Sequence, residues 1–297
     1  MILSNFRHPR ENNLKSAVLC MMFSVFFYAL QDVLVKMLPS DMHVMQICFF
    51  RAIFALIPIF IYSLTEPSEK LLETKNWSMH FWRSLFSSLA LFCFIGSFRL
   101  IPLADAYTLS FSCPLFMVAL CIPLLNEKVS LSLWLAVIAG FIGVLIMMRP
   151  GSDTLEVGGI LALVGGFFYA LSLIFVRKLS HQHQDSSTLI VLTFTVMSAL
   201  LTLPFLPFVW QPVDTQILWQ LMAIGILGGS AQLAMTQAFR LAPVSKLAPF
   251  DYASLIWAVA FGYLFFGEKP DTYVIAGALL IVSSGMMIMS MEKNARI

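Results

Sequence analysis

The stretch APFDYASLIWAVAFGYLFFGEKP, residues 248–270, decides the fold, because it is an apolar run of helix length with Asp251 in its interior and Glu268 at its end. The sequence immediately before it occurs twice in the chain. RLAP at 240–243 follows RLIP at 99–102 by 141 positions. The helix that decides the fold therefore has a counterpart in the first half of the chain.

A second block of sequence repeats with the same offset. FFYAL at 26–30 recurs at 167–171, 141 positions later, and Glu268 falls on Glu127. Separated blocks that share one offset indicate an internal duplication, and a duplication governs the interpretation of the whole fold. The predicted organisation is an N-terminal tail at 1–15, a first repeat at 16–150, a second repeat at 156–291 and a C-terminal tail at 292–297.

Composition assigns the chain to the membrane proteins. Hydrophobic residues make up 59% and charged residues 11% of the 297 residues, which is too few charges to cover a soluble surface of this size. A formal net charge of +2 supplies no basic face, so a nucleic-acid partner is not expected. The 5 cysteines lie inside apolar segments without C-x-x-C spacing and indicate neither a disulfide framework nor a zinc site.

Apolar runs separated by polar residues, proline or glycine predict an all-α integral membrane protein with ten transmembrane helices. Each run has about 20 residues, enough to cross a hydrocarbon core of about 30 Å. The first run is too long for a signal peptide and is expected to remain as a span. The predicted helices cover 16–38, 43–64, 78–98, 104–125, 129–148, 157–178, 186–208, 215–239, 244–267 and 271–291.

The odd number of helices in each repeat sets the topology. Five helices carry the chain to the other side of the membrane, so the second repeat enters from the opposite side and the two form an inverted repeat. With the N-terminus in the cytoplasm, 12 flanking Lys and Arg residues lie inside and 4 outside. This bias favours a multi-pass protein of the inner (cytoplasmic) membrane with both termini in the cytoplasm.

Several motifs resemble a known family. FFR at 49–51, SFSCPLF at 110–116 and the stretch that ends in Gly267-Glu268 resemble, together with the duplicated five-helix unit, the EamA-type branch of the drug/metabolite transporter superfamily. The resemblance implies a secondary transporter with a central cavity between two four-helix groups, the fifth and tenth helices lying outside. APFDY at 248–252 is similar to bacterial members that carry S-adenosylmethionine or riboflavin.

Four charged residues lie inside predicted spans, namely Asp32, Arg51, Arg83 and Asp251. A charge in the bilayer costs roughly 2.5 to 3.5 kcal/mol, so each needs a partner or a purpose. At about 1.5 Å per residue, Asp32 and Arg51 lie about 9 and 12 Å from the outer ends of their helices. Arg83 and Asp251 lie about 7 and 10 Å from the inner ends. These depths predict two pairs, which are either structural bridges or contacts to a zwitterionic or charged substrate.

These charges break the duplication. A scaffold role shared by both halves would not need them in one half only, so we expect them to serve a substrate or a coupling ion that contacts the halves differently. The expected partners are a small-molecule substrate, the lipid bilayer, and either a coupling proton or an exchanged metabolite. The positions related by the 141-residue offset to Arg51, Arg83 and Asp251 are the uncharged Leu192, Ile224 and Ser110.

Aromatic and amide side chains in the spans are candidates for substrate contacts, with simple packing as the alternative. Tyr28 and Tyr169 occupy equivalent places in the two repeats, beside polar neighbours such as Gln31. Gln232 and Gln237 are costly to leave unpaired in lipid, so they are expected to point inward. The candidates for substrate binding are Tyr28, Gln31, Asp32, Arg51, Arg83, Tyr107, Phe111, Tyr169, Gln232, Gln237, Asp251, Tyr252 and Trp257.

Two further pairs of residues have more than one interpretation. Pro114 and Pro249 interrupt apolar helices, where each frees a backbone carbonyl, and they indicate either tolerated kinks or part of a transport site. Glu127 and Glu268, each followed by lysine, are interpreted as charges at helix ends, with a gating role as the alternative.

Among the function classes, the sequence favours transport. An intramembrane enzyme would need a nucleophile with a base or clustered metal ligands, whereas the 5 histidines lie in tails, loops or helix ends. No catalytic residue, metal site or cofactor is therefore predicted. A channel would show rings of like charge or a carbonyl filter. The leading substrate is S-adenosylmethionine-like or amino-acid-like, and the alternative is riboflavin, another aromatic metabolite, or an exported drug or amino acid.

Overall fold

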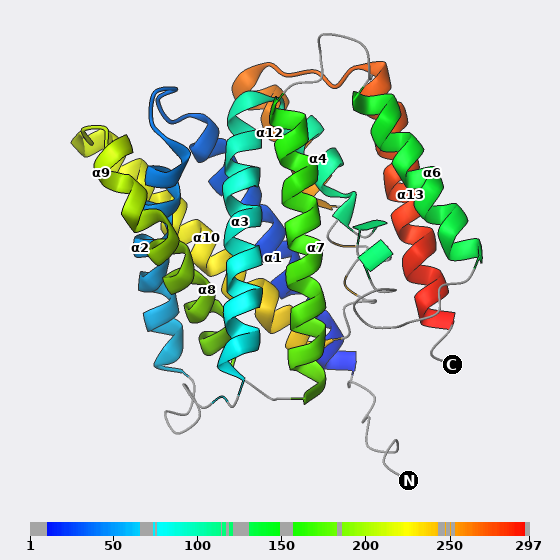
Figure 1. Cartoon of the computed structure of the whole chain (residues 1–297), viewed down its shortest axis with the longest axis horizontal. Coiled ribbons are helices and arrows are strands. Elements are labelled where there is room, and N and C mark those ends of the chain that lie inside the picture. The colour runs from blue at the N-terminus through cyan, green and yellow to red at the C-terminus, as the bar shows by residue number, and fades with distance from the viewer. Residues whose placement is uncertain are drawn as a thin grey trace.

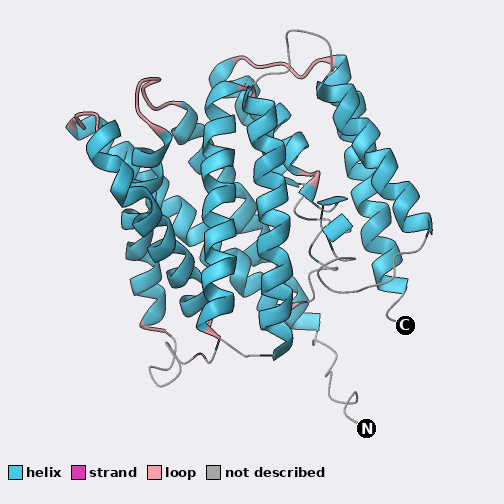
Figure 2. Ribbon diagram, in the orientation of Figure 1, coloured by secondary structure: helices cyan, strands magenta, loops and turns pink. Residues whose placement is uncertain are grey.

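The computed structural model of the chain is a bundle of long helices packed side by side (Figure 1). It describes residues 11–65, 74, 76–113, 115–116, 119–120, 131–148, 157–182, 186–242, 247, 250 and 253–294. Within these ranges helix is the only regular structure (Figure 2). The all-α prediction is confirmed for this part of the chain.

The helices follow the chain in two series. The first half contains α1 (Glu11–Lys36), α2 (Val44–Ser63), α3 (Trp77–Leu100), α4 (Leu103–Ser110) and α6 (Leu131–Met148). The second half contains α7 (Val157–Gln182), α8 (Ser187–Thr202), the 3-10 helix η2 (Leu203–Phe205), α9 (Leu206–Val209), α10 (Thr215–Leu241), α12 (Ala253–Phe266) and α13 (Thr272–Asn294).

Each predicted range contains a described helix, although the ends differ. The predicted helix at 186–208 is divided into α8, η2 and α9, because Pro204 and Pro207 lack a backbone N–H and each begins a new helical segment. α1 begins at Glu11, before the predicted residue 16. Pro114, Pro249 and Glu127 lie outside the described residues.

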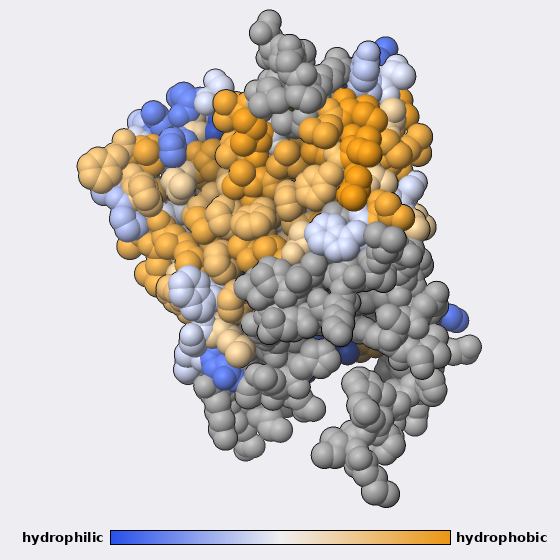
Figure 3. All heavy atoms as spheres, turned by 45° about the vertical axis from the view of Figure 1, so that its right-hand side comes forward, coloured by the Kyte–Doolittle hydropathy of each residue, from blue (hydrophilic) through white to orange (hydrophobic). Residues whose placement is uncertain are grey.

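The outer surface of the bundle suits a lipid environment. Large apolar side chains such as Leu19, Phe60 and Ile256 are 66–71% exposed, and Figure 3 shows a continuous apolar face between hydrophilic groups at its upper and lower ends. Soluble monomers rarely expose apolar patches of this size. Among the described residues, 6 helices are long and apolar enough to cross a membrane: Leu14–Lys36, Val44–Ser63, Trp77–Leu100, Val157–Phe175, Ser187–Val209 and Thr215–Leu241.

Helices of the two halves pack against each other throughout the bundle. α1 lies along α10, and α3 lies along α7. α2 packs on α8 and α10, α4 packs on α12, and α6 packs on α13. The α6–α13 pair lies at one side of the bundle, and the start of α1 and the end of α13 lie at its same, lower end (Figure 1). The interior of the bundle is therefore built from both halves.

Glycines on one face of α10 allow it to approach α2 closely. A Cβ atom at Gly225 would lie 2.4 Å from Cβ of Phe54, and one at Gly229 would lie 2.9 Å from the carbonyl oxygen of Ala55. Larger residues at these positions would separate the two helices. Small residues serve membrane helix packing in this way in general.

Candidate functional site

α1 carries a polar stripe from its middle to its last residue. Tyr28, Gln31, Asp32 and Lys36 follow the spacing i, i+3, i+4 and i+8, which places them on one helix face. Gln31 is 2% exposed and Asp32 is 3% exposed. A buried polar group left without a partner costs about 1–3 kcal/mol, so the partners of this stripe define the polar interior of the bundle.

Gln31 joins Asp32 to Arg51 of α2. Nε of Arg51 donates a hydrogen bond to Oε1 of Gln31 at 2.8 Å, and Nε2 of Gln31 donates to Oδ1 of Asp32 at 2.8 Å. The sequence predicted a direct pairing of Asp32 with Arg51. The structure instead places the Gln31 amide between them, with its oxygen toward the cation and its nitrogen toward the carboxylate, so the amide bridges the two charged groups.

Tyr107 of α4 completes the surroundings of Asp32. Its hydroxyl donates to Oδ2, so both carboxylate oxygens accept hydrogen bonds. The Tyr107 ring stacks on Phe98 of α3, with ring centroids 5.5 Å apart and planes inclined by 17°. This stacking holds the hydroxyl in place, and the carboxylate thereby connects α1 to α4.

Gly228 of α10 provides the space for this group. A Cβ atom at Gly228 would lie 2.1 Å from Oε1 of Gln31 and 3.0 Å from Nε and Nη2 of Arg51. The side chains that it would strike are both buried. Because the hydrogen bond between them leaves no room for a methyl group, glycine is required here.

A second polar group surrounds Arg83 of α3. Its Nη1 donates to the carbonyl oxygen of Ile190 on α8 at 2.5 Å. Tyr28 and Tyr169, the tyrosines at equivalent places in the two repeats, both lie near Arg83. The Tyr28 hydroxyl donates to Oε1 of Gln232 on α10. Arg83 thus lies where helices of both halves meet.

Sequence reasoning missed one contact in this region. The hydroxyl groups of Ser87 on α3 and Ser172 on α7 lie 2.5 Å apart and form a hydrogen bond. Serine is common on apolar helices, so neither residue stands out by type. The 141-residue offset supplies a signal, because it relates Ser172 to Gln31 and Ser87 to Gly228.

Gln237 belongs to a different set of contacts. It lies five residues after Gln232 and therefore about 140° around α10. Its Oε1 accepts from the hydroxyl of Tyr62 at 3.3 Å and from that of Ser187 at 3.4 Å. These bonds connect α10 to α2 and α8, and they place Gln237 apart from the Arg83 group.

The remaining aromatic candidates lie among apolar neighbours. Phe111 is buried in the cluster around Ala29 and Phe98, and Trp257 packs against the same cluster. The Trp257 ring lies edge-on to Phe26, with centroids 4.9 Å apart. Both therefore have a clear packing role. The other two candidates from the same region of the sequence, Asp251 and Tyr252, lie outside the described residues.

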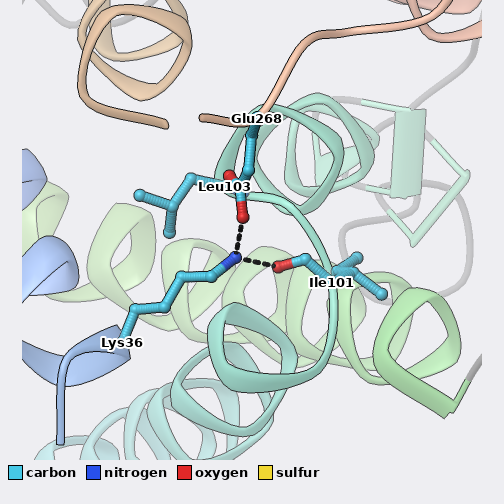
Figure 4. Close-up of polar contacts among 4 residues, drawn as sticks. All are labelled: Lys36, Ile101, Leu103 and Glu268. Carbon is cyan, nitrogen blue, oxygen red and sulfur yellow. Dashed lines mark hydrogen bonds and ion pairs between the residues drawn. The ribbon is translucent and has the colours of Figure 1, made fainter. Parts of the chain in front are cut away.

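An ion pair closes the upper end of the polar stripe. Nζ of Lys36 contacts Oε1 of Glu268 and donates to the carbonyl oxygen of Ile101 at 2.7 Å (Figure 4). Oε2 of Glu268 accepts from the backbone N–H of Leu103 at 3.1 Å. Gly267 has φ +67°, a left-handed conformation suited to glycine that ends α12 and turns Glu268 toward α1. The sequence indicates that Glu268 is a charge at a helix end, and the structure adds that its partner is Lys36.

This ion pair gives a first prediction. Lys36→Glu should lower the melting temperature of the detergent-solubilised protein, because two carboxylates would face each other where side chains are only 15–18% exposed. Adding Glu268→Lys should restore part of the loss by rebuilding the pair in reverse. Lys269→Glu is the matched control, since the adjacent Lys269 is exposed. Equal melting temperatures for Lys36→Glu and Lys269→Glu would contradict the structural role of the pair.

Known proteins place the chain in a family. The EamA-like transporter family matches twice, at residues 15–149 and 156–290. A solved crystal structure of a protein superposes with a TM-score of 0.64 at 15% identity, covering 93% of this chain and 98% of that chain. This likeness shows a common fold.

Similar curated proteins are bacterial transporters. The pseudopaline exporter CntI of Pseudomonas aeruginosa is 27% identical over 286 residues, 95% of this chain and 98% of the exporter. The riboflavin transporter of Vibrio cholerae is 30% identical over 243 residues, 80% of each chain. The S-adenosylmethionine uptake transporter of Rickettsia bellii is 26% identical over 270 residues, 89% of this chain and 90% of the relative.

The long apolar helices and the polar groups buried between them define a multi-pass membrane transport protein. The chain belongs to the EamA-like transporter family, within the drug/metabolite transporter superfamily that its motifs resemble. It is a transporter of small metabolites and not an enzyme.

Proposed function

We propose that this protein is a secondary transporter that carries a small zwitterionic metabolite, S-adenosylmethionine-like or amino-acid-like, by alternating access. In this proposal ten transmembrane helices form two inverted five-helix repeats, 16–150 and 156–291, in the inner membrane with both termini in the cytoplasm. The substrate binds centrally, between helices of both halves. A coupling proton or an exchanged metabolite drives the cycle.

The helix contacts support the inverted repeat. The 141-residue offset makes α7 the equivalent of α1 and α10 the equivalent of α3. If each helix is replaced by its equivalent in the other repeat, the contact of α1 with α10 becomes the contact of α7 with α3. The structure contains both contacts. The register agrees as well, because Gln31 lies against Gly228 and its equivalent Ser172 lies against Ser87. A twofold axis in the membrane plane accounts for both agreements.

The charges inside the bundle are the single observation that carries the zwitterionic substrate. Asp32, Arg51 and Arg83 are 3–5% exposed in helices of membrane-spanning length. Charged residues at such depth generally mark substrate or ion pathways. An acid and an arginine together suit a metabolite that has both a cationic centre and a carboxylate. Tyr28, Tyr107 and Tyr169 lie among these charges and can stack on a ring system.

A riboflavin-like substrate is the second candidate. The riboflavin transporter of Vibrio cholerae is among the relatives and is 30% identical to this chain. A neutral, planar substrate would depend on the aromatic and amide side chains more than on the charges. The relatives also include both an exporter and an uptake transporter. The direction of transport is therefore a separate question from the substrate.

Transport by reconstituted protein tests the proposal. Purified protein in proteoliposomes should accumulate labelled S-adenosylmethionine with saturation, and unlabelled compound should compete. Saturable riboflavin uptake without S-adenosylmethionine uptake would favour the second candidate. Flux that rises linearly with concentration, without competition, would indicate a channel and contradict a carrier.

The topology gives a second prediction. In a cysteine-free background, Ser40→Cys in the turn after α1 should react with a membrane-impermeant maleimide added to intact cells, because it lies at the proposed outer side. Asp185→Cys should react only after the membrane is opened. Labelling of Asp185→Cys in intact cells, with Ser40→Cys protected, would reverse the proposed orientation.

A further inference from the structure

Arg83 is a buried cation with unused hydrogen-bonding capacity. It is 5% exposed in the span formed by α3. Nη1 is engaged by the carbonyl oxygen of Ile190, whereas Nε is buried and has no hydrogen-bond partner. Nε and Nη2 form one edge of the planar guanidinium, and this edge matches the two oxygens of a carboxylate. The structure therefore leaves Nε, one of the two donors on this edge, without a partner.

The charge of Arg83 is not balanced by any described carboxylate. Between the residues that the structure describes, the ion pair formed is that of Lys36 with Glu268. Asp32 is engaged by Gln31 and Tyr107 instead. Asp251, which the sequence predicts as the partner of Arg83, lies outside the described residues. Within the described part of the chain the costly charge of Arg83 is left for a ligand to balance.

Other donors without partners lie on the same two helices. The hydroxyl groups of Ser84 and Ser88 on α3 and of Thr188 on α8 are buried and form no hydrogen bond. Ser84 follows Arg83 directly, and Thr188 lies two residues before Ile190, the residue whose carbonyl binds Arg83. α3 and α8 pack against each other. Within the described part of the chain, these hydroxyl groups and Nε of Arg83 are therefore buried polar groups whose hydrogen bonds are not made.

We propose that Arg83 binds the carboxylate of the transported metabolite through Nε and Nη2, with the neighbouring hydroxyl groups as additional donors. This inference rests on the proposed transport function and names the group of the substrate that Arg83 recognises. One guanidinium neutralises one carboxylate, so a singly charged carboxylate fits better than a phosphate with two charges. In this proposal Tyr28 and Tyr169, which lie near Arg83 and come from the two repeats, contact the remainder of the substrate.

The first arm of the test needs no ligand. Arg83→Gln should leave the melting temperature of the unliganded protein unchanged or raise it by about 2–4 °C, because it removes an uncompensated buried charge. Arg99→Gln is the matched control. Its guanidinium donates to the carbonyl oxygens of Met42 and Pro39, so its loss should lower the melting temperature. A large decrease with Arg83→Gln would overturn the inference, since it would reveal a structural arginine with its own counter-ion.

The second arm uses ligands that differ by one carboxylate. S-adenosylmethionine and the free amino acids are compared with decarboxylated S-adenosylmethionine and the amino-acid amides in thermal-shift titrations. At least one carboxylate compound should raise the melting temperature of the wild-type protein and of Arg99→Gln. Arg83→Gln should bind that compound at least about 100-fold more weakly, as expected for loss of a charged hydrogen-bonded contact. The decarboxylated partner should bind both proteins equally weakly.

Three results would overturn the assignment of Arg83 as the residue that binds the substrate carboxylate. They are equal binding of a carboxylate and its decarboxylated or amidated partner, undiminished binding by Arg83→Gln, and stabilisation by none of the carboxylates. In any of these cases, riboflavin uptake by the same reconstituted protein would show that the protein is a transporter but that Arg83 does not bind a substrate carboxylate. Absence of every saturable flux would instead count against the proposed transport function.

Discussion

Replacing Arg51 with glutamine is expected to reduce uptake by about 10- to 150-fold while the protein stays folded and inserted. Arg51 donates to Gln31, and Gln31 donates to Asp32. Without the cation, the Gln31 amide is free to rotate and the buried Asp32 carboxylate loses its compensating charge. A hydrogen bond to a charged group contributes about 1.5–3 kcal/mol, enough to disturb the geometry of the site.

A double-mutant cycle gives this prediction its control. Asp32→Asn should restore the melting temperature of Arg51→Gln, because the charge imbalance is removed, and should leave transport absent. The sequence makes the same prediction for Asp251→Asn as for Arg51→Gln. Normal transport by both Arg51→Gln and Asp251→Asn would mean that these charges are dispensable for transport. The riboflavin-like substrate would then replace the zwitterionic one as the proposal.

Gly228→Ala should also abolish transport, by separating α10 from α1 and α2. The added Cβ would lie 2.1 Å from Oε1 of Gln31, a distance that no side chain tolerates. Overpacking costs about 1–3 kcal/mol, and the displaced hydrogen bond to Arg51 adds about 1.5–3 kcal/mol. We expect a lower melting temperature as well as loss of uptake.

Gly96→Ala in α3 is the matched control for Gly228→Ala. Its Cβ would approach one atom, Cδ1 of Leu161 at 3.1 Å, which is the far end of a flexible side chain. This variant should therefore keep nearly normal stability and uptake. Similar losses of stability and uptake in Gly228→Ala and Gly96→Ala would mean that any added methyl group on these helices is harmful. That result would contradict a specific role of Gly228.

Much of the architecture follows from patterns that the sequence displays directly. The apolar runs predicted the helices because a membrane span requires an unbroken apolar length. The common offset of FFYAL and RLIP predicted the duplication because separated blocks rarely shift together by chance. The family resemblance rested on the duplicated unit together with motifs such as FFR at 49–51 and SFSCPLF at 110–116, and the two matches to the EamA-like family confirm it.

The partners inside the bundle could not be predicted in the same way. Counting residues gives the depth of Asp32 and Arg51 but not the direction in which each side chain points. Gln31 was therefore a candidate from the sequence, but its position between the two charges could not be predicted. Lys36 and Glu268 are 232 positions apart, and only the folded chain brings them together. Nη1 of Arg83 donates to the backbone carbonyl of Ile190, an apolar residue whose type gives no sign of this contact.

The contacts of Gln31 with Gly228 and of Ser172 with Ser87 have an evolutionary consequence. Equivalent positions meet at both contacts. One contact combines the long side chain of Gln31 with Gly228, which has no side chain, and the other combines the two short side chains of Ser172 and Ser87. After duplication, each copy has kept this contact between its helices while dividing the space differently. Only the long side chain can reach past the neighbouring helix to a third one. Unequal division of one inherited space is therefore how an ancestral symmetric scaffold acquires a polar connection on a single side, where an asymmetric metabolite can distinguish its two ends.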